Sequence, residues 1–342
     1  MSPLASDLRR MLDPAKNPLF LHAGSGRFYT AHRGGEVVGR IVAHVHHASN
    51  ARHGLARSCF GFFDCADDVE AARALLGAAE AFGRSQGCTE IAGNFNLTAM
   101  QQIGVVTAGF ENAPYTDQVY NPPHVPVLLA ACGYAPIFPM RTVELDLLCF
   151  DPETLLGGKS RAVLADRSLR WETLRRRDVP RLLRDVRLVL NDGFDRNPMF
   201  VPLTDEEFLF QAADMMWIVD PRISALVHGE EGPAGVVVCI PDLNPLLRAT
   251  GSRLTPLTPL HYLRFRWRRR RAVIIFYSVA RARHGQGLNG AMLYRVTRAL
   301  KEAGYETLGI TWIADENAAS LRQIEKLGAR ELHRLHLFRK EL

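Results

Sequence analysis

The sequence predicts an α/β (α+β) fold built from two similar halves. Its 342 residues suffice for two domains, each with its own hydrophobic core. In both halves a pair of β-type runs, a further strand, a helix and another strand follow one another in the same order. We place the first half at residues 1–150, a linker at 151–168 and the second half at 169–342.

The first half begins with a hairpin signal and continues as a strand–helix–strand unit. Residues 27–44 hold two β-type runs around the Gly-Gly pair at 34–35. A strand over 58–65 leads directly into a helix over 67–87, whose first turn holds acidic residues that suit the helix dipole. A strand over 89–93 follows. No glycine-containing loop separates the 58–65 strand from its helix.

The second half starts with a strand over 170–174 and a helix over 178–190. A second helix is expected after Thr204, which can act as its N-cap because a Glu stands at the capping-box spacing. Residues 236–240 form a continuous apolar run and predict a buried strand. Residues 246–271 fit either a loop or a helix.

A phosphate-binding site is predicted where an apolar, β-branched strand over 273–279 meets the next helix. The N–H groups of such a loop point at an anion, and the dipole of the following helix favours it. Gly285 and Gly287 allow the backbone to approach a phosphate without a Cβ atom. Further along, a strand over 307–313 leads into a short helix within residues 317–328.

These two motifs resemble those of the GNAT superfamily of acyl-CoA N-acyltransferases. The pyrophosphate loop of that superfamily reads Gln/Arg-x-x-Gly-x-Gly/Ala and aligns on residues 284–289, and its later motif has an Asn, a helix and a Glu-Lys-Leu-Gly ending. The resemblance implies tandem GNAT-like folds: a degenerate first copy, and a second copy that binds the pyrophosphate and pantetheine of acyl-CoA, the co-substrate. The residues that it assigns to CoA are Val279, Arg281, His284, Gly285, Gln286, Gly287, Leu288, Asn289, Gly290, Asn317 and Ser320.

Two departures from the superfamily pattern matter for the chemistry. Asn289 stands where members have Gly or Ala, so it either crowds the phosphate or offers it a side-chain donor. Ile324 stands where many members carry a Tyr that protonates the departing CoA thiolate. Tyr294, Ser320 or water must therefore protonate the thiolate, unless the thiolate leaves unassisted.

Amide formation from a thioester also needs a base for the amine and a donor for the oxyanion. The resemblance implies that backbone N–H groups near the end of the 277–279 run serve the oxyanion. Asp242 is the first candidate for the base, because it follows a buried strand and precedes a proline-bounded turn; the alternative is an Asx-turn. Tyr277 and Asp195 are weaker candidates, and Tyr277 also fits an ordinary strand residue.

Over its whole length the chain resembles a bacterial two-domain acyltransferase family that includes bacterial ceramide synthases. The matching segments are residues 61–64 (Gly-Phe-Phe-Asp), 120–123 (Tyr-Asn-Pro-Pro), 200–203 (Phe-Val-Pro-Leu) and 241–244 (Pro-Asp-Leu-Asn). This resemblance implies acyl transfer to a primary amine, that of a sphingoid long-chain base. Two alternatives stay open: acetyl-CoA-dependent acetylation of a small polar amine, and a CoA-binding sensor without turnover.

The net charge of +6 lies entirely in the second half, because residues 1–150 carry more Asp and Glu than Lys and Arg. Its densest part is the run over 264–271, in which Phe265 and Trp267 stand between arginines. The run has three readings: a solvated face, a grip on CoA phosphates, or contact with an anionic membrane with both aromatic residues inserted. Nothing in the sequence resembles a nucleic-acid-binding fold.

The remaining features predict a cytoplasmic protein without a metal, peripheral at the inner face of the membrane if it meets lipid. The N-terminus lacks the apolar core of a signal peptide, and the uncharged stretch over 118–140 contains five prolines, too many for a membrane helix. The six cysteines form no C-x-x-C pair. His44 and His46 share a strand face without a carboxylate or cysteine at ligand spacing, which favours a polar strand face or a domain contact over a metal site.

Overall fold

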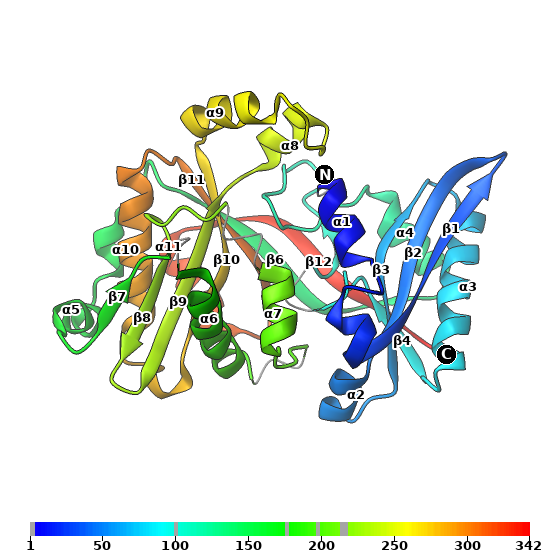
Figure 1. Cartoon of the computed structure of the whole chain (residues 1–342), viewed down its shortest axis with the longest axis horizontal. Coiled ribbons are helices and arrows are strands. Elements are labelled where there is room, and N and C mark those ends of the chain that lie inside the picture. The colour runs from blue at the N-terminus through cyan, green and yellow to red at the C-terminus, as the bar shows by residue number, and fades with distance from the viewer. Residues whose placement is uncertain (1–3, 99–101, 175–177, 196–198, 213–217) are drawn as a thin grey trace.

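The computed structural model describes residues 4–98, 102–174, 178–195, 199–212 and 218–342. They form one continuous twisted sheet with helices on both faces (Figure 1). The strands lie in the order β1-β2-β3-β4-β12-β6-β11-β10-β9-β8-β7, and β5 pairs with β12. In this part of the chain no helix combines the length and the apolar character that a bilayer span requires.

The first half has the predicted hairpin and the strand–helix–strand unit. The turn at Gly34 and Gly35 joins two antiparallel strands, and the next helix is capped by Asp68, whose side chain accepts hydrogen bonds from the N–H groups of Glu70 and Ala71. The elements are α1 (Ala5–Met11), β1 (Gly24–Arg33), β2 (Glu36–His46), α2 (His47–His53), β3 (Arg57–Cys65), α3 (Val69–Ser85), β4 (Glu90–Gly93), β5 (Val105–Ala108), α4 (His124–Ala131) and β6 (Ala135–Asp146).

The second half repeats this order of elements. Thr204 and Glu207 form the predicted capping box at the start of α7. Residues 246–271, which fitted either a loop or a helix, are mostly helical. The elements are α5 (Gly158–Ala165), β7 (Arg170–Glu172), α6 (Val179–Gly193), α7 (Asp205–Ala212), β8 (Ala225–Gly229), β9 (Gly232–Pro241), α8 (Asn244–Thr250), α9 (Thr258–Arg268), β10 (Arg271–Val279), α10 (Leu288–Glu302), β11 (Thr307–Ala314), α11 (Ala318–Leu327) and β12 (Arg330–Glu341).

Alternate residues of the buried strand β9 face two different helix layers. Val237 and Cys239 pack with the apolar face of α10. Val236 and Val238 pack with residues of α6 and α7, which lie in front of the sheet in Figure 1. This period of two is the ordinary strand alternation, so both faces of the central sheet are covered.

The two halves exchange their last strands. β6 ends the first half but pairs with β11 of the second, and β12 ends the chain but pairs with β4 of the first. Figure 1 shows β12 crossing from the second half to the edge of the first. The division into residues 1–150 and 169–342 therefore stays a prediction, and residues from both halves meet beside β11.

Candidate active site

The predicted phosphate loop joins β10 to α10. Gly285 and Gly287 have φ angles of +73° and +92°, in the left-handed region that favours glycine. No side chain caps the N-terminus of α10, so the N–H groups of its first turn remain available to an anion. His284 lies beside the strand end, with Nε2 at 2.9 Å from the carbonyl oxygen of Val279.

The two parallel strands beside this loop part to form a fork. β10 and β11 pair only from Arg271 with Thr307 to Ile274 with Ile310, although each strand continues beyond these pairs. The register of β10 against β9 shifts just after Ile274, and that of β11 against β6 just after Ile310. The edge of β10 that faces β11 thus loses its strand partner, and an extended ligand can pair with its backbone. We call this feature the β10–β11 fork.

The first half has the same fork between β3 and β4, but its own chain fills it. The N–H groups of Phe62 and Phe63 donate to the side-chain oxygens of Asn96 (2.7 Å) and Asn94 (3.4 Å). A Cβ atom on Gly61 would lie 1.7 Å from the carbonyl oxygen of Phe95, so no space remains between the strands. This explains physically why the first copy is degenerate: its backbone donors are already satisfied.

The linker helix α5 packs directly on the phosphate loop. Lys159 Nζ donates to the carbonyl oxygen of Gly285 at 2.8 Å. A Cβ atom on Gly287 would lie 2.6 Å from the backbone carbon of Lys159, and one on Gly290 would lie 2.5 Å from Ser160 Oγ. Lys159 was not among the predicted site residues. The Gly-Gly-Lys-Ser run at 157–160 is the only feature of the sequence that could have indicated its role.

Arg281 and Asp195 belong to an ion-pair network at the start of the loop. The backbone N–H and Nε of Arg281 donate to Asp192, and its Nη1 donates to Asp195 at 3.0 Å. Asp195 also accepts from Arg52 of α2 at 2.6 Å. Two arginines thus occupy the carboxylate of Asp195.

The tyrosines and the α11 residues lie around the loop rather than in one cluster. Tyr277 Oη donates to the carbonyl oxygen of Asn289 at 2.8 Å, and burial raises its pKa. Tyr294 Oη donates to Glu153 at 2.9 Å, on the side of α10 that faces the linker. Asn317 caps α11 by accepting from the N–H of Ser320. The catalytic roles of Tyr277 and Tyr294 remain predictions.

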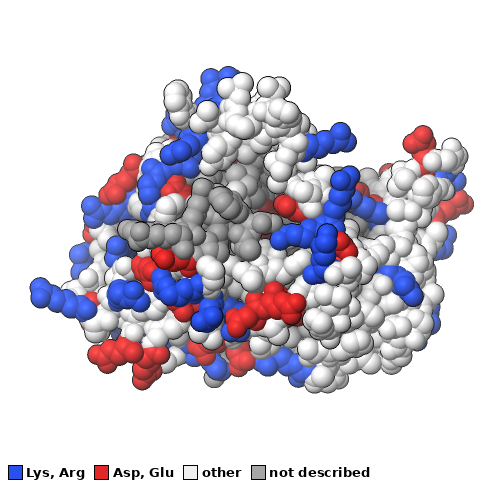
Figure 2. Space-filling view, in the orientation of Figure 1, with Lys and Arg blue, Asp and Glu red and all other residues white. Residues whose placement is uncertain are grey.

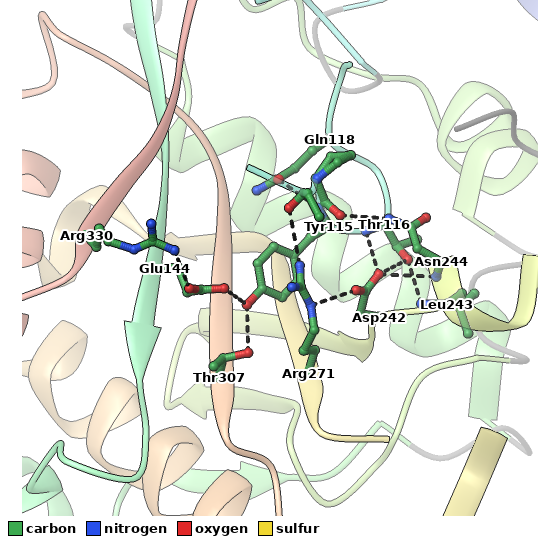
Figure 3. Close-up of polar contacts among 12 residues, drawn as sticks. Tyr115, Thr116, Gln118, Glu144, Asp242, Leu243, Asn244, Arg271, Thr307 and Arg330 are labelled. Atoms are coloured by element: carbon green, nitrogen blue, oxygen red, sulfur yellow. Dashed lines mark hydrogen bonds and ion pairs between the residues drawn. The ribbon is translucent and has the colours of Figure 1, made fainter. Parts of the chain in front are cut away.

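Asp242 lies at the opposite end of β10 from the phosphate loop (Figure 3). Its side chain is buried. Oδ1 accepts hydrogen bonds from the N–H (3.0 Å) and Oγ1 (2.9 Å) of Thr116 and from the N–H of Asn244 (3.2 Å), and Oδ2 accepts from Arg271 Nε at 3.0 Å. The contact with Asn244 is that of the Asx-turn alternative. The role of Asp242 as the base remains a prediction.

The hydrogen bonds between Asp242 and Thr116 also hold a segment of the first half against the fork. Residues 113–118, which we call the crossing segment, place the ring of Tyr115 against Gly309 and under the guanidinium of Arg271, whose Cζ lies 3.9 Å from the ring centroid. Tyr115 Oη donates to the carboxylate of Glu144 and lies 2.8 Å from Thr307 Oγ1, whose hydroxyl can donate to it, as Figure 3 shows. The sequence analysis missed this segment, because no pattern predicts that it packs against a strand almost two hundred residues away.

A small pocket of about 50 Å³ opens between the first half and the segment over 199–203. Polar side chains from α2 and β3 line one side, and the segment over 199–203 lines the other. Cys59, Phe95 and Met199 of its wall share an apolar cluster with Trp312 of β11. The pocket offers both polar and apolar surface, and part of its wall packs in the same cluster as Trp312.

His44 and His46 have structural contacts, and His46 also lines the pocket. His44 Nε2 lies 3.3 Å from the carbonyl oxygen of Phe95, and burial lowers its pKa to about 4, which keeps the ring neutral. His46 Nδ1 accepts from the N–H of Ser49 at the start of α2. Among the described residues, no group of three or more His, Cys, Asp or Glu is arranged to hold a metal ion.

The arginine run over 264–271 divides into two parts. Arg269, Arg270 and Arg271 form ion pairs with Asp220, Glu306 and Asp242. The exposed arginines of α9 have no ion-pair partner among the described residues; they are Arg264, Arg266 and Arg268. The whole length of β10, nine residues or roughly 27 Å, separates them from the phosphate loop, so a grip on CoA phosphates is not supported.

Apolar side chains accompany these arginines. Phe265 is buried, so the expectation that it inserts into a membrane is wrong. Leu257, Leu260, Leu263 and Trp267 recur at helical spacing and are 54–87% exposed. In Figure 2 this part of the surface, at the top of the view, is mostly white with blue side chains at its borders.

Comparison with known proteins identifies a domain in the second half. Residues 192–329, which include the loop, the fork and α11, match the model of the Acetyltransferase (GNAT) family. The chain carries a GNAT domain. Its predicted tandem GNAT-like fold is confirmed by a solved tandem GNAT protein from the clavulanic acid biosynthesis pathway, with a TM-score of 0.55 at 14% identity over 94% of this chain and 84% of that one.

Two curated relatives match the GNAT protein along its length. Protein YghO of Escherichia coli (strain K12) is 24% identical over 96% of this chain and 85% of its own. A bacterial ceramide synthase of Caulobacter vibrioides (strain NA1000 / CB15N) is 25% identical over 100% of this chain and 90% of its own. The chain is an N-acyltransferase of the GNAT type, and its fold implies acyl-CoA as co-substrate and an amine as acceptor.

Proposed function

We propose that this GNAT enzyme transfers a long-chain acyl group from acyl-CoA to the primary amine of a sphingoid long-chain base. The observation that carries acyl transfer is the β10–β11 fork, which is open and ends at an uncapped glycine loop, whereas the first-half fork is filled. The name of the Caulobacter vibrioides relative and the pocket of polar and apolar side chains support the lipid amine.

The backbone of the second half supplies most of the proposed binding site. The N–H groups of residues 285–290 and the ammonium of Lys159 would hold the pyrophosphate, and the free edge of β10 would pair with pantetheine. A free N–H of that edge would stabilise the oxyanion that forms when the amine attacks the thioester. Ile324 is buried and has no proton to give, so we propose that water protonates the thiolate.

The acceptor is tested by offering two acyl donors and two amines. We expect amide formation from palmitoyl-CoA and sphinganine, measured by mass spectrometry together with the release of CoA. Turnover of acetyl-CoA with a polyamine, and none of the long-chain pair, would favour acetylation of a small polar amine. CoA binding without amine-dependent turnover of either pair would favour the sensor.

The surface of α9 supports a membrane as the place where the enzyme meets a lipid amine. The exposed leucines and Trp267 offer apolar contacts, and the unpaired arginines beside them attract anionic lipid. The same assay tests this surface when sphinganine is presented in vesicles. Each basic residue near an anionic bilayer contributes about 1 kcal/mol, so replacing Arg264, Arg266 and Arg268 by Gln should weaken binding to anionic vesicles roughly 100-fold.

A matched control removes the same charge elsewhere. Arg27, Arg40 and Arg73 are exposed on the first half, and their replacement by Gln should leave binding to vesicles unchanged. The wild-type enzyme should bind phosphatidylglycerol vesicles less tightly as the salt concentration rises. Equal binding of both triple variants, or no preference for anionic over neutral vesicles, would contradict the membrane surface.

A further inference from the structure

Asp117 is held at the base of the β10–β11 fork by its two neighbours on the crossing segment. Asp242 binds the N–H and hydroxyl of Thr116. Gln118 Nε2 donates to the carbonyl oxygen of Ile310 at 3.1 Å, and Ile310 is the last residue of β11 that pairs with β10. The backbone of Asp117 is therefore fixed where the two strands begin to part.

The crossing segment lies on the face of the sheet that α6 and α7 cover. Tyr115 belongs to the apolar cluster that includes residues of both helices and Ile275, the first residue of β10 beyond the paired part of the fork. α6 ends against the open arm of β10, since a Cβ atom on Gly193 would lie 2.0 Å from Ser278 Oγ. Leu203, which lines the pocket, packs in the same apolar cluster as α6 and α7, on this face of the sheet.

The carboxylate of Asp117 is exposed and has no hydrogen-bond or ion-pair partner among the described residues. Its φ angle of +69° is in the left-handed region, which costs free energy for a residue other than glycine and is found most often at functional sites. Partial removal of bulk water by the surrounding protein raises the pKa of Asp117, and the solvent that still reaches this exposed side chain reduces the effect. No charged group contributes to this shift.

Other carboxylates near the fork are already engaged. Asp242 accepts four hydrogen bonds, and Glu144 accepts from Tyr115 and Arg330. Asp195 is held between Arg52 and Arg281. Asp117 thus differs from them in having both oxygens available to a substrate.

We propose that Asp117, supplied by the degenerate first half, is the catalytic base for acyl transfer in the fork of the second half. Asp242, which the sequence analysis favoured as the base, is then a positioning residue that acts through Thr116. This inference rests on the proposed transfer of an acyl group to an amine, and it applies to any primary amine.

In the proposed step the amine arrives as an ammonium ion. The carboxylate of Asp117 takes one proton, and the freed nitrogen lone pair forms the C–N bond while the carbonyl electrons move to oxygen. The intermediate then collapses, the C–S bond breaks, and its electron pair leaves on sulfur. The second nitrogen proton passes through water to the thiolate, and Asp117 releases its proton to solvent. The products are the amide, CoA thiol and one proton.

The test compares Asp117→Asn with Asp117→Glu and with Asp67→Asn, an exposed aspartate ahead of α3. General base catalysis contributes roughly 100- to 10,000-fold, so we expect kcat for palmitoyl-CoA and sphinganine to fall at least 100-fold in Asp117→Asn. CoA affinity should not change, Asp117→Glu should recover part of the rate, and Asp67→Asn should be normal. A kcat of Asp117→Asn within about three-fold of wild type would overturn the proposal.

A second measurement separates this proposal from the choice of acceptor. If wild type acylates only another amine, kcat is compared with that amine, and the lipid acceptor alone is wrong. Because the base must be ionised to accept a proton, kcat/KM of the wild type should rise with pH through the ionisation of Asp117, and Asp117→Asn should remove that rise. An unchanged pH profile of kcat/KM in Asp117→Asn would overturn the proposal.

Discussion

Replacing Gly287 with Val is expected to raise the Kd for CoA at least about 100-fold, a loss of about 2.8 kcal/mol. Gly287 adopts a φ angle of +92°, which a β-branched residue disfavours strongly. Its Cβ atom would also lie 2.6 Å from the backbone of Lys159, so the loop and α5 must separate. Both effects displace the N–H groups that face the pyrophosphate. Isothermal titration calorimetry with CoA measures the change.

Gly304→Val is the matched control for this variant. Gly304 has a φ angle of +79° and ends the same helix, but a Cβ atom there meets open space. The control suffers similar backbone strain far from the loop, so CoA affinity should stay within about two-fold of wild type. Wild-type affinity in a folded Gly287→Val variant would show that the loop does not bind CoA.

Replacing Asp242 with Asn is expected to lower both the stability and the turnover of the enzyme, with little change in CoA affinity. The new amide group would face donors from Thr116 or Arg271 that now bind carboxylate oxygens. Loss of a buried charge partner costs about 3–5 kcal/mol; because the side chain of Arg271 is 33% exposed, we expect about 2 kcal/mol by chemical denaturation. Turnover should fall at least about ten-fold because the crossing segment loses its anchor.

Thr116→Val distinguishes positioning by Asp242 from direct base catalysis. The variant keeps the carboxylate but removes the hydroxyl that donates to it and that accepts from the N–H of Leu243. If Asp242 acts through the crossing segment, Thr116→Val should also slow turnover. Near-normal turnover of Thr116→Val, together with a large loss in Asp242→Asn, would favour Asp242 as the base. Normal turnover in both variants would contradict each role.

The sequence predicted correctly those elements that depend on residues close together in the chain. The Gly-Gly turn, the capping box at Thr204 and the glycine loop at Gly285 each depend on residues close in sequence, and the structure has all three. The extent of α9 could not be decided, because alternating arginines and aromatic residues fit a helix or a loop. Only packing against the sheet separates Phe265, which is buried, from Trp267, which is exposed.

The contacts that shape the candidate site join residues far apart in sequence. Asn94 and Asn96 read as ordinary polar residues after a strand, yet their side chains fill the first fork. Tyr115 and Gln118 contact β11 only because β6 and β12 exchange partners between the halves. No periodic pattern in the sequence indicates that the two halves exchange strands. For this reason the candidates for the base that the sequence predicts all lie in the second half.

The exchange also gives the degenerate first half a physical role. It cannot accept pantetheine in its own fork, but it supplies β6 beside β11 and the crossing segment over the base of the working fork. Arg52 of α2 adds an ion pair to Asp195, which also binds Arg281 of the phosphate loop. The second half alone would therefore lack part of its site.

The most direct test of this account is hydrogen exchange of the intact chain with and without CoA, followed by mass spectrometry. We expect CoA to slow exchange in residues 276–291, which contain the open arm of β10 and the phosphate loop. Exchange in residues 61–65 should not change, because the N–H groups of Phe62 and Phe63 are already bonded within the first fork. Protection of residues 61–65, or none in residues 276–291, would contradict the assignment of CoA to the fork of the second half.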